Sequence, residues 1–192
     1  METSLVVSYP VLLAASLAEQ NVAKVDDHLR STDSAFCALT DFRQEPPITV
    51  DAGSSIDAAL ADMMRLGVHA LLVTDEEFER GNLRVLGLIT AYDIERQRPH
   101  RSPGTTEFRV PKAIKVAEAM TPWDELSLVN YGLLQTLTAQ SLYEMFQGTG
   151  LTHLIVVDMH GDDPAIARGL LSRATLAKRL RHGRNAAAYQ TS

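Results

Sequence analysis

Two side chains of complementary chemistry stand three residues apart, where an apolar strand is expected to turn into a helix. The peptide Gly87-Leu88-Ile89-Thr90-Ala91-Tyr92-Asp93 places a hydroxyl at Thr90 and a carboxylate at Asp93. Residues at this spacing lie on one side of a helix, so one ligand can touch both. A carboxylate accepts hydrogen bonds from the two hydroxyls of a ribose, and a helix N-terminus favours phosphate. The turn therefore predicts a nucleotide site.

The same two residues also have a purely structural explanation. Thr90 can cap the helix, and Asp93 can be an acidic residue of its first turn, worth about 0.3 to 1 kcal/mol through the helix dipole. The turn alone leaves both explanations open. Its repetition elsewhere in the chain favours ligand binding.

The turn recurs later in the chain as Gly169-Leu170-Leu171-Ser172-Arg173-Ala174-Thr175. The hydroxyl is kept at Ser172, but Thr175 stands where the first copy has its carboxylate. Thr175 cannot make the charge-assisted bonds to a ribose diol, each of which contributes about 1.5 to 3 kcal/mol. We therefore expect one good site and one poor or empty site.

The repeat is longer than the turn, because Gly67 to Asp75 matches Gly150 to Asp158. Each copy is predicted to contain a strand, a helix, two strands and a helix. The leading strands are expected at Ile48 to Val50 and Leu126 to Val129, and the trailing helices at Ala91 to Arg96 and Arg173 to His182.

The central helix of each copy has start and stop signals. In the first copy Ser54 or Ser55 is the N-cap and Gly67 follows the end. Its expected buried face is Ile56, Ala59, Leu60, Met63 and Met64. In the second copy Thr138 is the N-cap, and Gly148 and Gly150 end the helix. Its expected buried face is Ala139, Leu142, Met145 and Phe146.

This order of motifs resembles a CBS domain in each copy, and the pair resembles a stand-alone, bacterial-type tandem known as a Bateman module. The resemblance runs from Glu45 to Gly183. It is carried by Pro46-Pro47-Ile48-Thr49-Val50, the Gly-x-x-Thr-x-x-Asp turn and Ala119-Met120-Thr121-Pro122. It implies an α/β (α+β) fold of two pseudo-symmetric β-α-β-β-α units, with adenosine-containing ligands in clefts between them.

The resemblance also implies a role for individual residues. Thr90 would contact a phosphate or ribose, and Asp93 would accept from the ribose hydroxyls. His69 matches a position that in some family members reaches phosphate. The adenine slot would be formed, partly by backbone groups, by Leu88, Ile48, Val68 and Ala70. A weaker second site would use Ser172, with His153 as either a ligand contact or a structural group.

Around the two units we expect an N-terminal extension at 1–44, the first unit at 45–98, a basic linker at 99–119, the second unit at 120–183 and a flexible tail at 184–192. The extension is predicted to hold a helix near Val11 to Asn21 and a short strand at Ala35 to Leu39, which either cap the module or form a dimer contact. The linker's basic residues either attract ligand phosphates or form a solvated connection.

Composition narrows the function classes. The formal net charge of −6 argues against a nucleic-acid partner. The apolar run from Leu5 to Ala18 is too short and interrupted to span a bilayer, so we expect a cytoplasmic protein without a membrane partner. The single cysteine, Cys37, is expected to be a buried thiol.

No spacing typical of a metal site, a nucleophile elbow or a phosphate-binding loop occurs in the sequence, so we predict no catalytic residue and no metal. The resemblance implies a regulatory protein, not an enzyme, that binds AMP, ADP, ATP or S-adenosylmethionine. It would form a homodimer and signal to a separate effector protein by a change of conformation or oligomeric state. The alternatives are a ligand-independent scaffold with a decayed site and a small enzyme acting on a nucleotide.

Overall fold

The computed structural model describes residues 11–13, 28–75, 82–97, 113–159 and 165–190. These residues belong to two compact units that differ in how the chain enters them. Unit 1 is formed by described residues of 47–126, whereas unit 2 combines residues of 10–46 with residues of 127–192. Unit 1 is therefore inserted, in sequence, between the two parts of unit 2.

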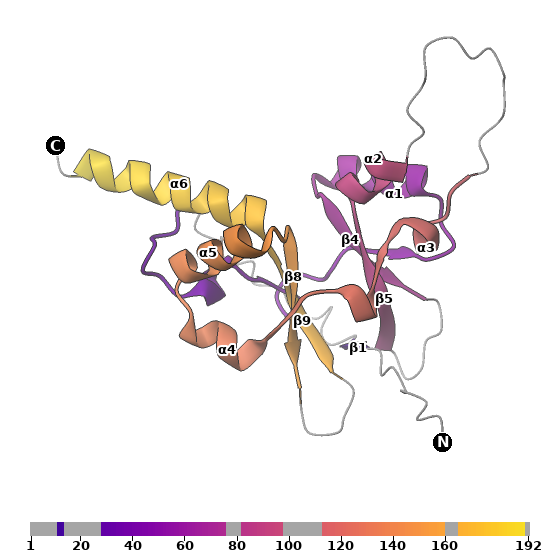
Figure 1. Ribbon diagram of the computed structural model, residues 1–192, viewed down its shortest axis with the longest axis horizontal. Helices are drawn as coiled ribbons and strands as arrows, with labels where there is room; N and C mark the ends of the chain where they lie inside the picture. Colours follow the sequence, from indigo (N-terminus) through magenta and orange to yellow (C-terminus); the bar gives the residue numbers. More distant parts are fainter. Residues whose placement is uncertain (1–10, 14–27, 76–81, 98–112, 160–164, 191–192) are drawn as a thin grey trace, which may run out of the picture. The chain divides into compact units, whose positions relative to one another are not determined.

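Unit 1 is a small sheet with helices on one face (Figure 1). Its elements are β3 (Thr49–Asp51), α1 (Ile56–Leu66), β4 (Ala70–Thr74), β5 (Asn82–Thr90), α2 (Ala91–Gln97), α3 (Val116–Ala119), β6 (Thr121–Pro122) and the 3₁₀ turn η2 (Trp123–Glu125). Strand β3 pairs with β4 in parallel, β4 pairs with β5 antiparallel, and β6 adds to the other edge of β5. The strand–helix–strand–strand–helix order predicted from the sequence is confirmed in this unit.

Helix α1 begins and ends where the sequence predicts. The Ser55 hydroxyl accepts from the Ala58 N–H at 3.2 Å, so Ser55 rather than Ser54 is the N-cap. Gly67 takes a left-handed conformation with φ +68° and ends the helix. Its buried face is Ile56, Ala59 and Met63, with Leu60 half-buried. The prediction for Met64 is wrong: it lies at the margin of the apolar stripe and is 77% exposed.

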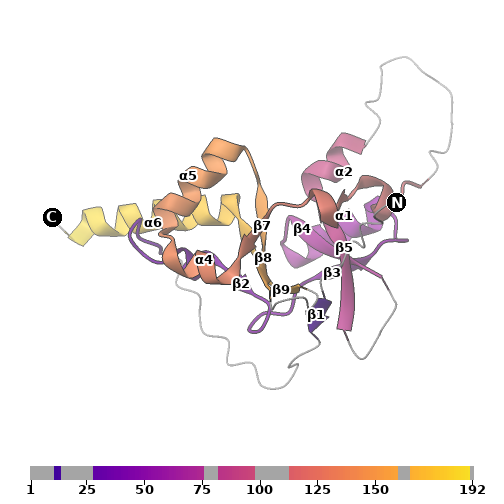
Figure 2. The same ribbon diagram turned by 60° about the horizontal axis from the view of Figure 1, so that its bottom comes forward.

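Unit 2 repeats this plan with additions (Figure 2). Its elements are β1 (Val11–Leu13), the 3₁₀ helix η1 (Ala35–Ala38), β2 (Thr40–Asp41), β7 (Leu128–Asn130), α4 (Tyr131–Thr136), α5 (Ala139–Thr149), β8 (His153–Asp158), β9 (Ile166–Ser172) and α6 (Arg173–Gln190). Strand β7 is parallel to β8, β8 is antiparallel to β9, and both β1 and β2 pair with β9.

Helix α5 has the predicted cap, because the Thr138 hydroxyl accepts from the Ser141 N–H at 3.1 Å. The side chains of Ala139, Leu142 and Phe146 are buried, and that of Met145 is half-buried. Gly148 does not end the helix, which continues to Thr149 and stops at Gly150 with φ +71°. Helix α4 was not predicted; the Asn130 side chain starts it by accepting from the N–H groups of Gly132 and Leu133.

In each unit a short segment of the chain, 114–122 in unit 1 and 33–41 in unit 2, adds to the edge of the sheet in the same way. We call these the edge segments. In unit 1, α3 and β6 follow a contact in which the Ile56 N–H donates to the Ile114 carbonyl at 3.0 Å. In unit 2, η1 and β2 follow the matching contact, from the Ala139 N–H to the Asp33 carbonyl at 2.8 Å. Residues 33–41 therefore do for unit 2 what residues 114–122 do for unit 1.

Several expectations for the N-terminal segment are wrong. Residues 35–38 form a 3₁₀ helix rather than a strand, because the buried Ala35 and Ala38 are three residues apart, which is one 3₁₀ turn. Cys37 falls between them and is exposed, not buried. Val11–Leu13 is a strand and not the start of a helix, since it finds a partner at Ile166. The rest of the predicted helix lies outside the described residues.

Boundaries elsewhere shift by a few residues. The leading strands are Thr49–Asp51 and Leu128–Asn130, and α2 ends one residue later than predicted. Helix α6 runs to Gln190, through residues expected to be a flexible tail, because three consecutive alanines at 186–188 favour helix. Arg101, Arg109 and Lys112 of the expected basic linker lie outside the described residues, as does Arg98 at the end of the expected first unit.

Each unit has its own apolar core between sheet and helices. In unit 1 the core contains Met63, Leu71, Val73, Ile89 and Ile94. In unit 2 it contains Phe146, Leu154, Val156, Leu171 and Leu176, together with Leu29, Ala35 and Ala38 from the N-terminal segment. No described helix is long and apolar enough to cross a membrane.

Candidate functional site

Thr90 and Asp93 meet at the junction of β5 and α2. The Thr90 N–H and hydroxyl both donate to Asp93 Oδ2, at 2.9 and 2.6 Å, and the Asp93 N–H donates back to Thr90 Oγ1 at 3.2 Å. This reciprocal set of bonds is a capping arrangement, so Thr90 and Asp93 do stabilise the start of the helix, as the structural explanation requires. Capping does not by itself decide whether they also bind a ligand. Both side chains remain half-buried rather than enclosed.

Thr90 leaves one oxygen of the Asp93 carboxylate, Oδ1, without a hydrogen bond from its own groups. Both bonds that Asp93 receives from Thr90 end on Oδ2, which fixes the orientation of the side chain without using Oδ1. Across the described residues, no arginine, lysine or histidine forms an ion pair with Asp93. A held, partly shielded carboxylate without a cation is suited to accept hydrogen bonds from neutral hydroxyl groups.

The sheet register brings Ala70 directly opposite Thr90. His69 precedes Ala70 and is exposed; its carbonyl accepts from the Ala91 N–H at 3.0 Å and so ties the start of α2 to the start of β4. Thr90, Asp93, Ala70 and His69 are thus gathered at one end of unit 1.

The other residues of the predicted adenine slot are placed differently. Ile48 and Val68 are half-buried and pack against the core of unit 1, and the Ile48 carbonyl accepts from the Leu72 N–H at 3.1 Å. Leu88 pairs with Leu72 and is buried. Leu88 and Thr90 share one face of β5 because side chains alternate along a strand.

The matching position of unit 2 has the same backbone and different chemistry. His153 lies opposite Ser172, as Ala70 lies opposite Thr90. The Arg173 N–H donates to the Thr152 carbonyl at 2.9 Å, as that of Ala91 does to His69. The Thr175 N–H reaches Ser172 Oγ only at 3.5 Å, and His153 Nδ1 lies 3.1 Å from the Thr152 hydroxyl.

Each unit also carries a cross-strand ion pair at the far end of its central hairpin. Asp75 pairs with Arg84 in unit 1, and Asp158 accepts from the Arg168 Nε and Nη2 at 3.1 and 3.0 Å in unit 2. Both acids end the repeated apolar strand, where the sequence shows them as Asp75 and Asp158. Their partners could not be found from spacing, because the two hairpins differ in length.

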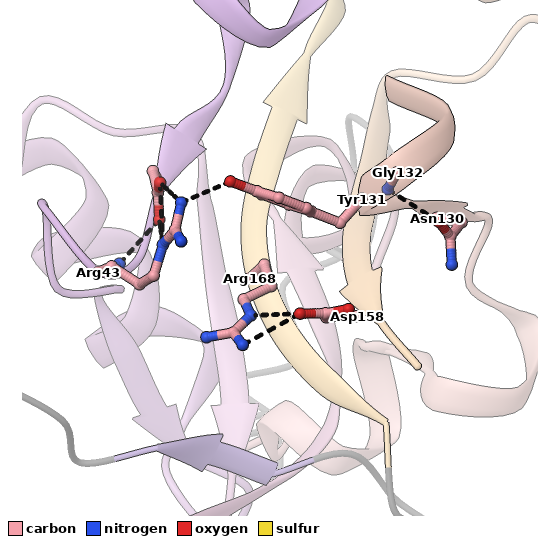
Figure 3. A network of polar contacts seen from close by, with 7 residues as sticks. Arg43, Asn130, Tyr131, Gly132, Asp158 and Arg168 are labelled. Atoms are coloured by element: carbon pink, nitrogen blue, oxygen red, sulfur yellow. Dashed lines mark hydrogen bonds and ion pairs between the residues drawn. The ribbon is translucent and has the colours of Figure 1, made fainter. Parts of the chain in front are cut away.

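A second polar network joins β2 to α4 in unit 2 (Figure 3). Arg43 donates through Nε and Nη2 to the Asp41 carboxylate, and its Nη2 also donates to the Tyr131 hydroxyl at 2.6 Å. The Arg43 guanidinium lies over the Tyr131 ring, 5.2 Å from its centre. Sequence reasoning missed this network because α4 itself was not predicted.

The charges of this network shift two pKa values. Burial would raise the pKa of Asp41, but the hydrogen bonds from the Arg43 side chain and backbone, with the charges of Arg43 and Arg168, lower it below its ordinary value. The hydrogen bond to Asp41 chiefly raises the pKa of Arg43. The pair is therefore ionised throughout the physiological range.

Within the part of the chain that the structure describes, no group of three or more His, Cys, Asp or Glu side chains is arranged to hold a metal ion. Polar side chains also gather at the two strand-to-helix turns, where Thr90, Asp93 and Ser172 are half-buried. The fold and these turns define a chain built from two βαββα units of the same design.

Comparison with known protein families finds a match to part of the chain. The model of the CBS domain family matches residues 39–99. The chain therefore carries a CBS domain in this segment. None of the curated proteins matches it in sequence.

Solved structures share the fold at low sequence identity. An uncharacterized conserved protein from Pyrococcus horikoshii is 19% identical with a TM-score of 0.53, and the match covers 80% of this chain and 96% of that one. The CBS domain of a bacterial CNNM/CorC family Mg²⁺ transporter, solved in complex with ATP, is 15% identical with a TM-score of 0.50 over 80% and 89% of the two chains.

GMP reductase from Trypanosoma brucei, solved in complex with guanosine 5'-monophosphate, is 16% identical with a TM-score of 0.50. The match covers 79% of this chain but only 26% of the reductase, so this chain spans about a quarter of that enzyme's length. The likeness concerns the fold and not the reaction of the enzyme.

Proposed function

We propose that this protein is a regulatory module that binds an adenosine-containing ligand at Thr90 and Asp93 of unit 1. The observation that carries the proposal is the Asp93 carboxylate, held by two bonds from Thr90 and without a cationic partner among the described residues. In this geometry the ribose hydroxyls donate to Asp93, while Ala70 leaves room beside Thr90.

The ligand class is supported by the fold. The CBS domain of the CNNM/CorC transporter, which has this fold, was solved with ATP. AMP, ADP, ATP and S-adenosylmethionine all carry the adenosine that such a site would read. Ligand occupancy in the cytoplasm would then pass to a separate effector protein through a change in conformation or in the association of a homodimer.

The Thr90 hydroxyl and the Asp93 carboxylate are bonded to each other in the helix cap, so we propose binding without turnover. Incubation with each nucleotide followed by chromatography tests this point. Recovery of unchanged nucleotide is expected, and a new product would favour the alternative of a small enzyme.

A bound ligand should stabilise the folded protein against thermal unfolding. A ligand at one hundred times its dissociation constant raises the free energy of unfolding by about 2.7 kcal/mol. Thermal unfolding with each of the four ligands should show a raised midpoint for the wild type with at least one of them. Asp93→Ala should abolish the rise, because the ribose loses its acceptor.

Glu95→Ala is the matched control, since Glu95 is an exposed acid on the same helix. It removes the same charge and should leave the ligand-induced rise intact. No rise with any of the four ligands would favour a ligand-independent scaffold, for which the capping role of Thr90 and Asp93 is sufficient.

A further inference from the structure

Charge is divided unevenly between the helices of the two units. In unit 1 each of α1, α2 and α3 has one more acid than base in its sequence. In unit 2, α4 has no charged residue and α5 has Glu144 alone. Helix α6 has no acid, and its basic residues are Arg173, Lys178, Arg179, Arg181 and Arg184. Because the formal net charge of the whole chain is −6, α6 is an exception in an acidic protein.

Structural roles account for only part of the charge of α6. The Arg179 side chain is buried and donates to the Cys37 carbonyl at 2.6 Å, so it ties η1 to α6. The helix dipole favours basic residues in the last turn, where α6 has none, and disfavours a positive charge in the first turn, where Arg173 stands. Lys178 and Arg181 lie in the middle of the helix, beyond the range of either effect.

Lys178 and Arg181 share one exposed side of α6. They are three residues apart, a spacing at which helical side chains are neighbours, and both are exposed. Among the described residues, no carboxylate pairs with either of them. On α1, by contrast, Asp62 neutralises Arg65 at 2.8 Å. Like charges at this spacing repel each other, and α6 contains no acid that would offset the repulsion.

A third exposed cation lies next to the middle of α6. The Leu29 N–H donates to the Arg179 carbonyl at 3.2 Å, which places the backbone leading into Arg30 beside the helix. Arg30 is exposed, and the nearby Asp33 accepts from the Arg30 backbone N–H at 2.8 Å rather than from its guanidinium. We call Arg30, Lys178 and Arg181 the basic face. In Figures 1 and 2 the second half of α6 runs past the end of α5.

We propose that the basic face docks an acidic segment of a partner protein, a run of Asp and Glu side chains. Such a segment would neutralise cations that have no carboxylate partner among the described residues, so the two surfaces are complementary in charge. The net negative charge of the chain favours a short acidic segment over a nucleic acid, whose charge continues beyond α6. Among the described side chains of α6, no large apolar one is exposed to enter a lipid surface.

The inference deepens the proposed function and rests on it in one respect, because the acidic segment would belong to the effector protein that responds to the ligand. The contact itself requires only the charges of Arg30, Lys178 and Arg181. It can therefore be tested on the full chain without any nucleotide.

Fluorescence anisotropy of a fluorescein-labelled decaglutamate peptide, titrated with the full chain, tests the docking surface. The wild type should bind decaglutamate and not decaglutamine. The affinity should fall as the salt concentration rises from about 0.05 to about 0.5 M, because salt screens exposed charges. Lys178→Glu/Arg181→Glu should bind at least about tenfold more weakly, since two attractions become two repulsions.

Arg65→Glu/Arg96→Glu is the matched control, because it makes the same change of net charge at exposed positions of α1 and α2. It should change the affinity by less than about twofold, as screening weakens the effect of distant charges. Lys178→Arg/Arg181→Lys keeps both charges and should bind like the wild type. Equal weakening by the two charge reversals, or no binding of decaglutamate at low salt, overturns the inference.

Two further measurements test the choice of occupant. If a single-stranded oligothymidylate binds more tightly than decaglutamate and is weakened by Lys178→Glu/Arg181→Glu, the face is a nucleic-acid site and the inference is wrong. Sedimentation velocity tests a second copy of this chain as the occupant. A wild-type dimer that dissociates in Lys178→Glu/Arg181→Glu would assign the face to self-association and also overturn the inference.

Peptide binding and ligand-induced stabilisation can fail independently. Decaglutamate binding that depends on Lys178 and Arg181, without stabilisation by any of the four adenosine-containing ligands, supports the docking surface and contradicts the proposed function. Stabilisation that depends on Asp93, without decaglutamate binding, overturns the docking surface and leaves the proposed function standing.

Discussion

Asp41 and Asp93 are both held by neighbouring donors, and they differ in what balances their charge. Asp41 is buried, and Arg43 neutralises it with a forked set of hydrogen bonds. Asp93 is half-buried and is oriented by the neutral Thr90. The first carboxylate is fully engaged in holding β2 beside α4, whereas the second keeps its charge available at an accessible position.

At the residue scale we predict that Asp41→Asn destabilises the protein by about 1 to 2 kcal/mol at pH 7. The substitution removes charge-assisted bonds from a buried acceptor, and the partly exposed Arg43 limits the loss because water can solvate it. Urea unfolding measures the change. Asp62→Asn breaks an exposed pair with Arg65 and should alter stability by less than about 0.5 kcal/mol.

The same pair predicts a dependence on pH. The pKa of Asp41 is lower in the folded protein than its ordinary value of about 3.9 in an unfolded chain. The contribution of the ionised Asp41 carboxylate to the free energy of unfolding is therefore fully present above about pH 5. It is lost as the pH falls through the pKa of Asp41 in the folded protein. The stability difference between wild type and Asp41→Asn should shrink below pH 4, and a constant difference down to pH 2 would contradict this account.

At the scale of elements, the edge segments depend on two glycines. A Cβ atom on Gly87 would lie 2.4 Å from the Thr121 carbonyl oxygen, and one on Gly169 would lie 2.4 Å from that of Thr40. The short strands β6 and β2 can approach only because these positions carry no side chain. Each glycine opens the turn motif of its unit, Gly-x-x-Thr in one and Gly-x-x-Ser in the other.

Gly169→Ala should therefore destabilise the protein by about 1 to 3 kcal/mol, since backbone must move to relieve the contact. Gly148→Ala is the matched control, because it lies inside α5 with nothing within 4 Å of the added atom. It should raise stability by up to about 1 kcal/mol through helix propensity. Chemical denaturation of both variants gives the comparison, and changes of the same sign would refute the close-approach argument.

The elements that the sequence predicted are those specified by local patterns. Helices α1 and α5 follow from apolar spacing, a Ser or Thr cap and a terminal glycine; the caps at Ser55 and Thr138 and the ends at Gly67 and Gly150 are confirmed, whereas Met64 and Gly148 are not placed as predicted. Of the site, the proximity of Thr90 and Asp93 follows from their spacing, whereas the place of Ala70 opposite Thr90 depends on the register of β4 against β5. Strand β1 and helix α4 were missed because their form depends on Ile166, Arg43 and other distant partners.

A repeat signal for the edge segments was nevertheless present. Ala38-Leu39-Thr40 matches Ala119-Met120-Thr121 in residue type and in the placement of its buried alanine. The first of these lies before Glu45, where the resemblance begins, and therefore within the predicted N-terminal extension at 1–44. They complete unit 2 through Leu29, η1 and β2.

At the scale of the whole molecule, we predict that a chain beginning at residue 47 retains unit 1 and loses the fold of unit 2. Unit 2 would lack β1, β2 and the buried Leu29, Ala35 and Ala38. Hydrogen exchange should then be fast in β8 but remain slow in β4. The emission of Trp123, the single tryptophan, should stay that of a buried ring, because it belongs to unit 1.

A chain beginning at residue 28 is the control, since it keeps η1 and β2 and should preserve slow exchange in β8. If β8 is equally protected when the chain begins at residue 47, the N-terminal segment is dispensable for unit 2.

The insertion of unit 1 between the two parts of unit 2 sets an order of events during synthesis. Residues 28–46 leave the ribosome before unit 1, whereas their partners in β9, α5 and α6 are translated after it. Unit 1 is complete once residue 126 has emerged, and domains generally fold as units while the chain grows. Until α6 has been made, residues 28–46 lack their partners. A prematurely terminated chain would therefore contain a folded unit 1 and an apolar N-terminal segment that has no partner.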